Sequence, residues 1–432
     1  MKFFTFSLRF FAFVLLAISL KTQAQQIINH QIISANGGVF EFSAPYNDYV
    51  SVQTINPSTG EVSIFDTIYS QSVQDVCISG LQAYIAAQDS LIKYDLSTYQ
   101  RLAAEEVSGI NKVLLYGDVL IISRQYPVTS GFIQIRDAVT LDLIHQFEEV
   151  SGEAAGIVVS NDKAYVAVNG GWAGTSGKIA IIDLIGLRFD SEIDLGPQAI
   201  GIYNLYSHKG SIISVNRSPY GATSGSLSTL NPDNFNFINH VFTNATTGFG
   251  AGIMNSRLYC IFNGNIGSVS LETMSIENIE LISNPAAADF GSITSACVDT
   301  INGKIFINAG DFFSFGQGYS YSTEGVALST FESGISAEAM NIEYRNSTSI
   351  PAVDRQKVAI YPNPFSSSTV LKGIQSGESI HIFQLNGMEV YHQMAAETGL
   401  MEISLPSLSA GMYILQIHHG NMLISSQKLI KK

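Results

Sequence analysis

The chain has 432 residues, and its 36 acidic residues outnumber its 22 lysines and arginines, which gives a formal net charge of −14. Such a chain is not expected to bind nucleic acid, because phosphate backbones attract basic surfaces. Hydrophobic residues make up 46% of the chain, charged residues make up only 13%, and there are 37 glycines. This composition argues against a disordered or helical protein and favours a compact all-β protein with many turns.

The first residues have the three parts of a signal peptide. Lys2 and Arg9 supply positive charge, residues 10–20 form an apolar stretch, and residues 22–24 (Thr-Gln-Ala) place small side chains before a cleavage site. The apolar stretch is too short to span a bilayer, and no later stretch approaches the ~18–20 apolar residues required. We therefore expect a signal peptide over residues 1–24 and no transmembrane segment in the mature chain.

Residues 25–344 repeat a unit of about 45 residues with four strand-like segments, which is the pattern of a β-propeller blade. A Thr-Ser-Gly sequence precedes the third segment of three units and begins at residues 129, 175 and 223. The period predicts about seven blades, the first at residues 38–69, with residues 27–30 or 341–344 closing the ring. Six blades are the alternative if the first unit is irregular. By its periodicity alone, the repeat resembles the seven-bladed propellers of the YVTN and quinoprotein-dehydrogenase-like group.

Loops of unequal length are expected on one face of this propeller, since the connection between the second and third strands emerges on the same side of every blade. The first two of these loops are short, at residues 56–60 and 88–90, and most later ones are long. The long loops carry the residues that we predict to bind a ligand: Arg124, Tyr126, Trp172, Arg217, Tyr220, Phe313, Phe315 and Tyr319. Aromatic rings suit flat or ring-shaped ligands, and the two arginines suit a carboxylate or phosphate. The alternative is that the rings pack together and only order the loops.

No catalytic or metal-binding signature is found. The eight histidines include no His-x-x-x-His pair, and there is no Gly-x-Ser-x-Gly sequence. Asp95, Asp137 and Asp183 recur at matched positions, where we expect them to accept backbone hydrogen bonds in the turn before the fourth strand. The three cysteines have no metal-like spacing and are expected to be buried strand residues, and the alternative is one disulfide bond with one free thiol: Cys77, Cys260 and Cys297. We therefore predict no catalytic residue and no metal, and the sequence identifies no cofactor.

Residues 357–432 form a second run of short alternating strands separated by turns, which predicts a small β-sandwich. The run begins with Tyr-Pro-Asn-Pro-Phe at residues 361–365, contains Leu-Ser-Ala-Gly-Met-Tyr at residues 408–413, and has a lysine-rich end. These motifs, in this order, resemble the type A C-terminal sorting domain of the type IX secretion system. The alternative is an ordinary carbohydrate-binding or immunoglobulin-like sandwich. The resemblance assigns the sorting motif to Tyr361, Pro362, Asn363, Pro364, Gly411, Tyr413, Lys431 and Lys432.

The resemblance implies export through the periplasm of a Gram-negative bacterium to its outer surface or beyond, with the type IX machinery as the partner of residues 357–432. The predicted domains are a signal peptide (1–24), an all-β propeller (25–344), a linker (345–356) and the sorting domain. We expect a secreted or cell-surface propeller that binds a small molecule, glycan or protein through aromatic loops. The alternatives are an exported propeller enzyme of the lyase, lactonase or dehydrogenase type and an adhesion or structural protein.

Overall fold

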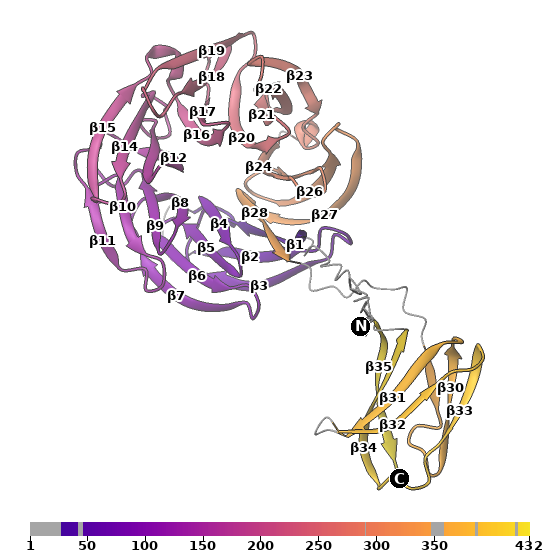
Figure 1. Ribbon diagram of the computed structural model, residues 1–432. Helices are drawn as coiled ribbons and strands as arrows, with labels where there is room; N and C mark the ends of the chain where they lie inside the picture. The colour runs from indigo at the N-terminus through magenta and orange to yellow at the C-terminus, as the bar shows by residue number, and fades with distance from the viewer. Residues whose placement is uncertain (1–26, 42–45, 290, 347–357, 385–387, 420–421) are drawn as a thin grey trace, which may run out of the picture. The chain divides into compact units, whose positions relative to one another are not determined.

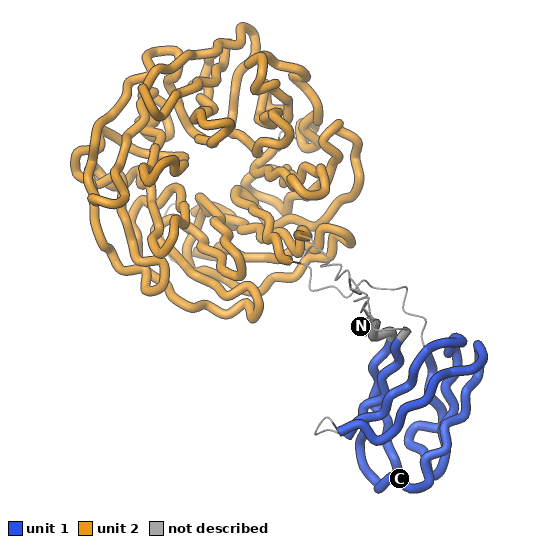
Figure 2. Tube along the Cα trace, in the orientation of Figure 1, with its two compact units in different colours: residues 1–25, 347–432 blue, residues 26–346 orange. Residues whose placement is uncertain are grey.

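The computed structural model describes residues 27–41, 46–289, 291–346, 358–384, 388–419 and 422–432. The predicted signal peptide lies outside these residues, as does the predicted linker except for its first two residues. The chain divides into two compact units, which Figure 2 colours separately: the larger spans residues 26–346, and the smaller includes residues 347–432. The division agrees with a cargo domain followed by a C-terminal β domain.

The larger unit is a seven-bladed β-propeller, as predicted, with seven four-stranded antiparallel sheets around a central axis (Figure 1). Each blade is given from its innermost strand outward. Blade 1 consists of β28 (Ala339–Asn346), β1 (Ile27–Asn36), β2 (Val50–Ile55) and β3 (Val62–Ile68), and blade 2 consists of β4 (Asp75–Ser79), β5 (Gln82–Ala87), β6 (Ser90–Asp95) and β7 (Gln100–Glu106). Blade 3 consists of β8 (Ile110–Tyr116), β9 (Val119–Arg124), β10 (Ile133–Asp137) and β11 (Leu143–Phe147), and blade 4 consists of β12 (Ala154–Ser160), β13 (Lys163–Val168), β14 (Lys178–Asp183) and β15 (Arg188–Asp194).

Blades 5 to 7, in the same order, are β16 (Ile202–His208), β17 (Ser211–Asn216), β18 (Ser224–Leu230) and β19 (Phe237–Thr243); β20 (Thr247–Met254), β21 (Arg257–Phe262), β22 (Asn265–Ser270) and β23 (Ser275–Ile282); and β24 (Ser292–Asp299), β25 (Lys304–Gly310), β26 (Phe315–Ser322) and β27 (Ala327–Ile335). Two single-turn 3-10 helices, η1 (Pro197–Ala199) and η2 (Ala287–Asp289), lie in the connections that lead into blades 5 and 7.

The ring closes through the pairing of β28 with β1, so both segments proposed for closure take part, and they pair with each other. Glu343 is fully buried at this junction, opposite Gln31, whose amide Nε2 donates to the Glu343 carboxylate at 2.6 Å. Arg345 forms an ion pair with the same carboxylate and donates to the Leu96 carbonyl of blade 2 at 2.9 Å. A buried charge needs such partners, because an isolated carboxylate in the interior is strongly destabilising.

Blades 2, 4 and 6 each form a tyrosine hydrogen bond with the next blade, and in each case the tyrosine lies on the second strand. A tyrosine at an equivalent position of β5, β13 and β21 is almost fully buried, and its hydroxyl donates to a backbone carbonyl of the following blade at 2.9, 3.5 and 3.5 Å. These residues are Tyr84, Tyr165 and Tyr259. Apolar contacts between neighbouring blades surround them, for example in the cluster of Ala155, Tyr165 and Leu205. The interfaces between blades therefore combine hydrophobic burial with a directional hydrogen bond.

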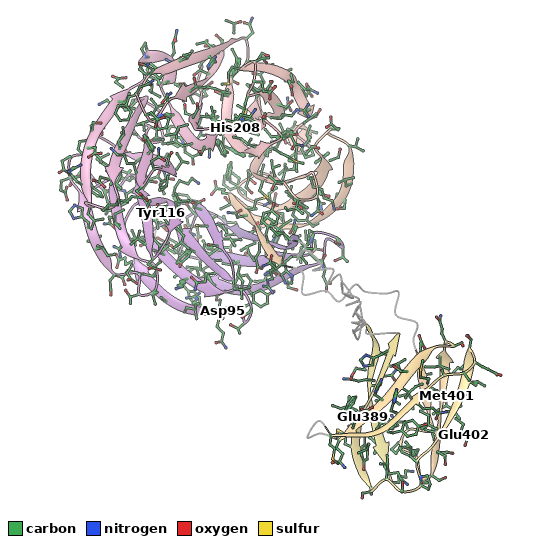
Figure 3. The ribbon with its side chains drawn as sticks, viewed as in Figure 1. Asp95, Tyr116, His208, Glu389, Met401 and Glu402 are labelled. Carbon is green, nitrogen blue, oxygen red and sulfur yellow. The ribbon has the colours of Figure 1, made fainter. Side chains whose placement is uncertain are left out.

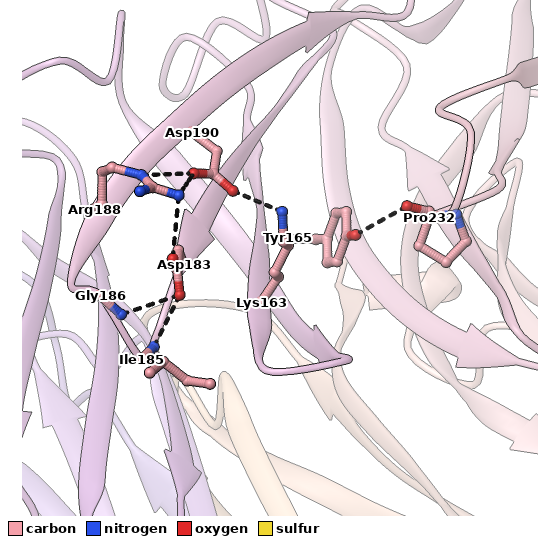
Figure 4. Close-up of polar contacts among 8 residues, drawn as sticks. All are labelled: Lys163, Tyr165, Asp183, Ile185, Gly186, Arg188, Asp190 and Pro232. Atoms are coloured by element: carbon pink, nitrogen blue, oxygen red, sulfur yellow. Dashed lines mark hydrogen bonds and ion pairs between the residues drawn. The ribbon is translucent and has the colours of Figure 1, made fainter.

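The recurring aspartates have the structural role that the sequence predicts. The Asp183 carboxylate accepts the backbone N–H groups of Ile185 and Gly186 at 3.0 and 3.1 Å, and it also contacts Arg188 (Figure 4). Asp95 and Asp137 accept backbone N–H groups in the equivalent turns. Figure 3 places Asp95 at the outer rim of the ring, whereas Tyr116 and His208 lie nearer its centre. The repeated carboxylates order turns and do not converge on one site.

All three cysteines are buried in strands and free of disulfide bonds, as predicted. Burial, together with the nearby Asp75 charge, raises the pKa of Cys77 to about 12. Burial also raises the pKa values of Cys260 and Cys297. Because the thiolate is the reactive form of cysteine, these thiols act as small apolar side chains.

The smaller unit is a β-sandwich of two antiparallel sheets. One sheet has the order β29 (Ala359–Tyr361), β30 (Ser368–Ile374) and β33 (Gly399–Ser404), and the other has β32 (Glu389–Met394), β31 (Glu378–Gln384), β34 (Gly411–His419) and β35 (Met422–Lys431). Alternate residues of these strands meet in one apolar core that includes Phe365, Leu371, Ile382, Tyr413 and Leu429. The alternation of apolar and polar residues in the sequence is therefore the pattern of a sheet with one buried face.

Replacing Glu343 with alanine is expected to destabilise the propeller by about 3 kcal/mol, because it leaves Arg345 and Gln31 without their buried acceptor. The melting temperature of the propeller transition should fall by several degrees. The matched control is Glu272→Ala, which removes an exposed ion pair with Lys209 and should change stability by no more than about 1 kcal/mol. Equal losses in the two variants would contradict the role assigned to the closure.

Candidate functional site

One face of the propeller carries the connections between second and third strands, and we call it the loop face. The loop of blade 1 on this face is not residues 56–60, as the sequence suggested, because those residues join β2 to β3 and lie on the opposite face. The error arises because β28 provides the innermost strand of blade 1, which makes β1 its second strand. The loop of blade 1 on the loop face is therefore residues 37–49. It brings Tyr49 against Tyr69 with ring centroids 5.1 Å apart, an aromatic pair that the sequence analysis missed.

Five of the predicted ligand-binding aromatics are highly exposed. Their exposed fractions are 80% for Tyr126, 86% for Trp172, 105% for Tyr220, 72% for Phe313 and 81% for Phe315. Among the described residues, none of these five rings makes a ring contact with another aromatic side chain. The structure therefore does not support the alternative in which these rings order the loops by packing together.

Two of the predicted ligand-binding residues have structural roles instead. Arg124 is buried, and its guanidinium donates to the carbonyls of Ser108 and Gly131 at 2.8 and 3.0 Å and to the Gln146 side chain at 3.0 Å. Tyr319 lies within β26 and packs against the core between blades 6 and 7. The sequence predicted neither role, because residue type alone does not tell whether a loop arginine or a strand-edge tyrosine is buried or exposed.

Hydrogen bonds between neighbouring blades hold the bases of the loops. The backbone N–H of Tyr126 donates to the Glu153 carboxylate at 2.9 Å, and the N–H of Gly201 donates to the Ser176 carbonyl at 2.9 Å. The Gly201 carbonyl in turn accepts the N–H of Arg217 at 2.8 Å. Gly201 has φ of 81°, and a Cβ there would lie 2.0 Å from the Arg217 carbonyl oxygen, so this crossing requires glycine. The loops thus have fixed bases and exposed aromatic tips.

Four charged side chains and one tyrosine lie near the loop-face ends of the inner strands or at the start of the blade 5 loop, and we call them the central cluster: Asp75, Lys112, Tyr203, Arg217 and Glu338. The Lys112 ammonium lies 5.7 Å from the centroid of the Tyr203 ring and 3.6 Å from the Asp75 carboxylate. Arg217, the first residue of the blade 5 loop, places its guanidinium carbon 5.9 Å from the same ring centroid. Arg217 is one of the predicted ligand-binding residues, and Lys112 and Tyr203 are not among them.

The environment of the central cluster raises the pKa values of two of its members. Burial disfavours the charge of Lys112, but the Asp75 carboxylate and the Tyr203 side chain more than compensate, so the pKa of Lys112 is raised. Burial raises the pKa of Glu338 to about 7, although a hydrogen bond with Ser336 and the charge of Lys112 both act to lower it. Lys112 therefore stays charged, while Glu338 is in part protonated near neutral pH.

A polar cavity of about 360 Å³ lies on the opposite face, between blades 6 and 7. Its lining includes Arg257, whose guanidinium pairs with Glu277 at 2.6 Å and with Glu324 at 3.4 Å. The two carboxylates outnumber the single guanidinium, so this group is acidic, and the cavity contains none of the predicted ligand-binding residues. Within the described parts of the chain, no group of three or more His, Cys, Asp and Glu side chains is arranged to hold a metal ion.

In the C-terminal sandwich, the Tyr-Pro-Asn-Pro-Phe segment near the start of the domain forms hydrogen bonds with the last strand, β35. The Asn363 side chain donates to the Lys428 carbonyl at 2.7 Å and accepts the Ile430 N–H at 2.9 Å. Phe365 is buried, and the Lys431 ammonium lies 5.5 Å from the centroid of its ring. The two ends of the motif are therefore one structural unit, which explains why both occur in the same sequence pattern.

The other residues of the motif are divided between core and surface. Tyr413 is buried and donates to the Ser409 carbonyl at 2.9 Å, which fixes the turn before β34. Gly411 is the first residue of β34, and Tyr361 and Lys432 are exposed. Of the eight motif residues, only Tyr413 and Lys431 are buried, and the other six are exposed: Tyr361, Pro362, Asn363, Pro364, Gly411 and Lys432. The motif therefore combines a few residues that fix the fold with exposed residues that are free to contact a partner.

With this geometry established, comparison with known proteins identifies the sandwich. Residues 359–432 match the family described as the secretion system C-terminal sorting domain. The chain is thus an exported β-propeller protein. It carries a sorting domain of the type IX secretion system, which directs it to the cell surface or to secretion. Among the described residues, no helix is long and apolar enough to cross a membrane.

Solved structures resemble the propeller in fold. A hypothetical selenium-binding protein from Sulfolobus tokodaii matches with a TM-score of 0.54 and 10% identity, over 74% of this chain and 94% of that chain. The hydrazine synthase of Kuenenia stuttgartiensis matches with a TM-score of 0.50 and 11% identity, over 64% of this chain and 96% of that chain. At such identities the likeness concerns the fold and transfers no function. A search of curated protein sequences gives no significant match.

Glu338→Gln is expected to stabilise the propeller at pH 8 and to have little effect at pH 5. Because burial raises the pKa of Glu338 from 4.5 to about 7, the folded protein holds the proton of this carboxyl more tightly than the unfolded chain does. The resulting contribution to stability is fully present below pH 4.5 and is lost as the pH rises through about 7. The variant avoids a buried charge at high pH, so its advantage should approach about 2 kcal/mol there. Thermal denaturation at both pH values measures the difference, and Glu324→Gln is the exposed control. A stability difference that does not change between pH 5 and pH 8 would contradict this account.

Proposed function

We propose that this exported propeller is a binding protein, and that it takes up a small molecule, glycan or protein through the aromatic residues of the loop face. The observation that carries the proposal is the high exposure of aromatic residues on loops of four blades and at the first residue of β26: Tyr126, Trp172, Tyr220, Phe313 and Phe315. Exposed aromatic rings that lie on one surface are typical of recognition sites, because their burial by a ligand is strongly favourable.

The fixed bases of the loops support the same function. Where Gly201 links Ser176 to Arg217, the backbone of two loops is already ordered before any ligand binds. Affinity is lost whenever a binding surface has to be ordered on association, and a surface that is already ordered avoids part of that loss. The rings also have few rotatable bonds, which limits the entropy lost when a ligand immobilises them.

The double variant Trp172→Ala, Tyr220→Ala is expected to weaken ligand binding at least about tenfold, because aromatic anchors of this kind contribute about 2 kcal/mol or more. Both side chains are exposed, so the melting temperature of the free protein should hardly change. A thermal-shift screen of the full chain against glycans, corrinoids and cofactors identifies a ligand, and calorimetry then compares the variants. Phe235→Ala, on the opposite face, is the matched control. A large loss of stability in the double variant would instead indicate a packing role.

Deletion of residues 357–432 is expected to leave the propeller in the periplasm, since the truncated chain lacks the domain that directs export. Fractionation of cells that express the full-length and truncated chains measures the distribution. The full-length Trp172→Ala variant serves as a control, and it should be exported normally because its sorting domain is intact. If the truncated chain reached the cell surface or the medium, residues 357–432 would not be required for export.

A further inference from the structure

The central cluster brings together side chains that are distant in the sequence and belong to different blades. Lys112 lies on the inner strand of blade 3, and Tyr203 lies on the inner strand of blade 5, so the two side chains meet in front of blade 4. The inner strand of blade 4 begins with Ala154, Ala155 and Gly156, which leave room for this contact. A Cβ at Gly156 would lie 2.3 Å from the Tyr203 carbonyl oxygen. Small residues in one blade therefore allow its two neighbours to share a site.

The positive charge of the cluster is only partly balanced. Lys112 has the Asp75 carboxylate at 3.6 Å. Arg217 is exposed, and no carboxylate of the described residues lies within 4.0 Å of its guanidinium. In a chain with 36 acidic and 22 basic residues, an arginine without its own carboxylate that lies over the same aromatic ring as a second cation is unexpected from composition. Burial also disfavours the charged form of Glu338, so this carboxyl does not fully balance the positive charge of Lys112 and Arg217.

We propose that Arg217, Lys112 and Tyr203 form a subsite for the carboxylate or phosphate of a ligand whose ring system stacks on the aromatic loops. This inference rests on the function proposed above and specifies the ligand as an anionic ring compound. Arg217 precedes Tyr220 by three residues in the same loop, so one short segment carries both a guanidinium and an exposed ring. An arginine guanidinium forms paired hydrogen bonds with carboxylate and phosphate, and the Lys112 ammonium adds a second positive charge.

The single tryptophan of the chain makes a direct test possible. Trp172 is highly exposed on the loop face, so its fluorescence reports on this surface alone. The full-length protein is titrated with phenyl phosphate, benzoate and benzyl alcohol, and inorganic phosphate is then added as a competitor. The expected result is that at least one of the two anionic compounds changes Trp172 emission at concentrations about tenfold lower than benzyl alcohol does, as one charge-assisted contact predicts. Whichever anion binds more tightly identifies the chemistry as phosphate or carboxylate.

Arg217→Gln should remove the preference for the anionic compounds, and Lys112→Met should reduce it. Arg188→Gln, an exposed arginine paired with Asp183 and Asp190 on blade 4, should leave the preference unchanged. If benzyl alcohol binds as well as the two anions, the anionic subsite is wrong while binding by the aromatic loops stands. If none of the compounds changes Trp172 emission, the anionic subsite is contradicted, and the binding function is then judged by the ligand screen and the Trp172→Ala, Tyr220→Ala comparison.

Discussion

The pairing of β28 with β1 is the interaction on which the rest of the propeller depends. It joins residues that are more than three hundred positions apart, and it completes blade 1 with a strand from the end of the cargo domain. The fully buried Glu343 carboxylate lies at this junction with Gln31 and Arg345. Without this closure, blade 1 would have three strands, and the inner strands of blades 2 and 7 would lose the neighbour that separates and supports them.

The closure also positions the site. Glu338 immediately precedes β28, and it is brought to the central axis together with Lys112 from blade 3 and Tyr203 from blade 5. The exposed aromatic residues lie on loops whose bases are bonded to the adjacent blade. The loop face therefore presents exposed aromatic rings and a charged cluster, and the loop of blade 5 contributes to both through Tyr220 and Arg217.

Periodicity was sufficient to predict the seven blades, because each blade repeats the same order of strand, turn and strand. It was not sufficient for blade 1, where the repeat is displaced by one strand: the true loop-face connection contains Tyr49, and residues 56–60 belong to the opposite face. The sequence also did not predict which of the proposed binding residues are exposed. Trp172 is exposed and remains a candidate, whereas Arg124 is buried and forms hydrogen bonds at the base of a loop. Lys112 was missed because a lysine within an apolar strand gives no local signal, and its partners are supplied by other blades.

The order of the chain gives the closure a further consequence. The strand that completes the ring ends at Asn346, and the sorting domain begins only after it. A chain whose synthesis stops before the ring can close therefore also lacks the domain that directs export. Among chains cut short during synthesis, the order of the two domains therefore restricts the export signal to those that contain every strand of the propeller.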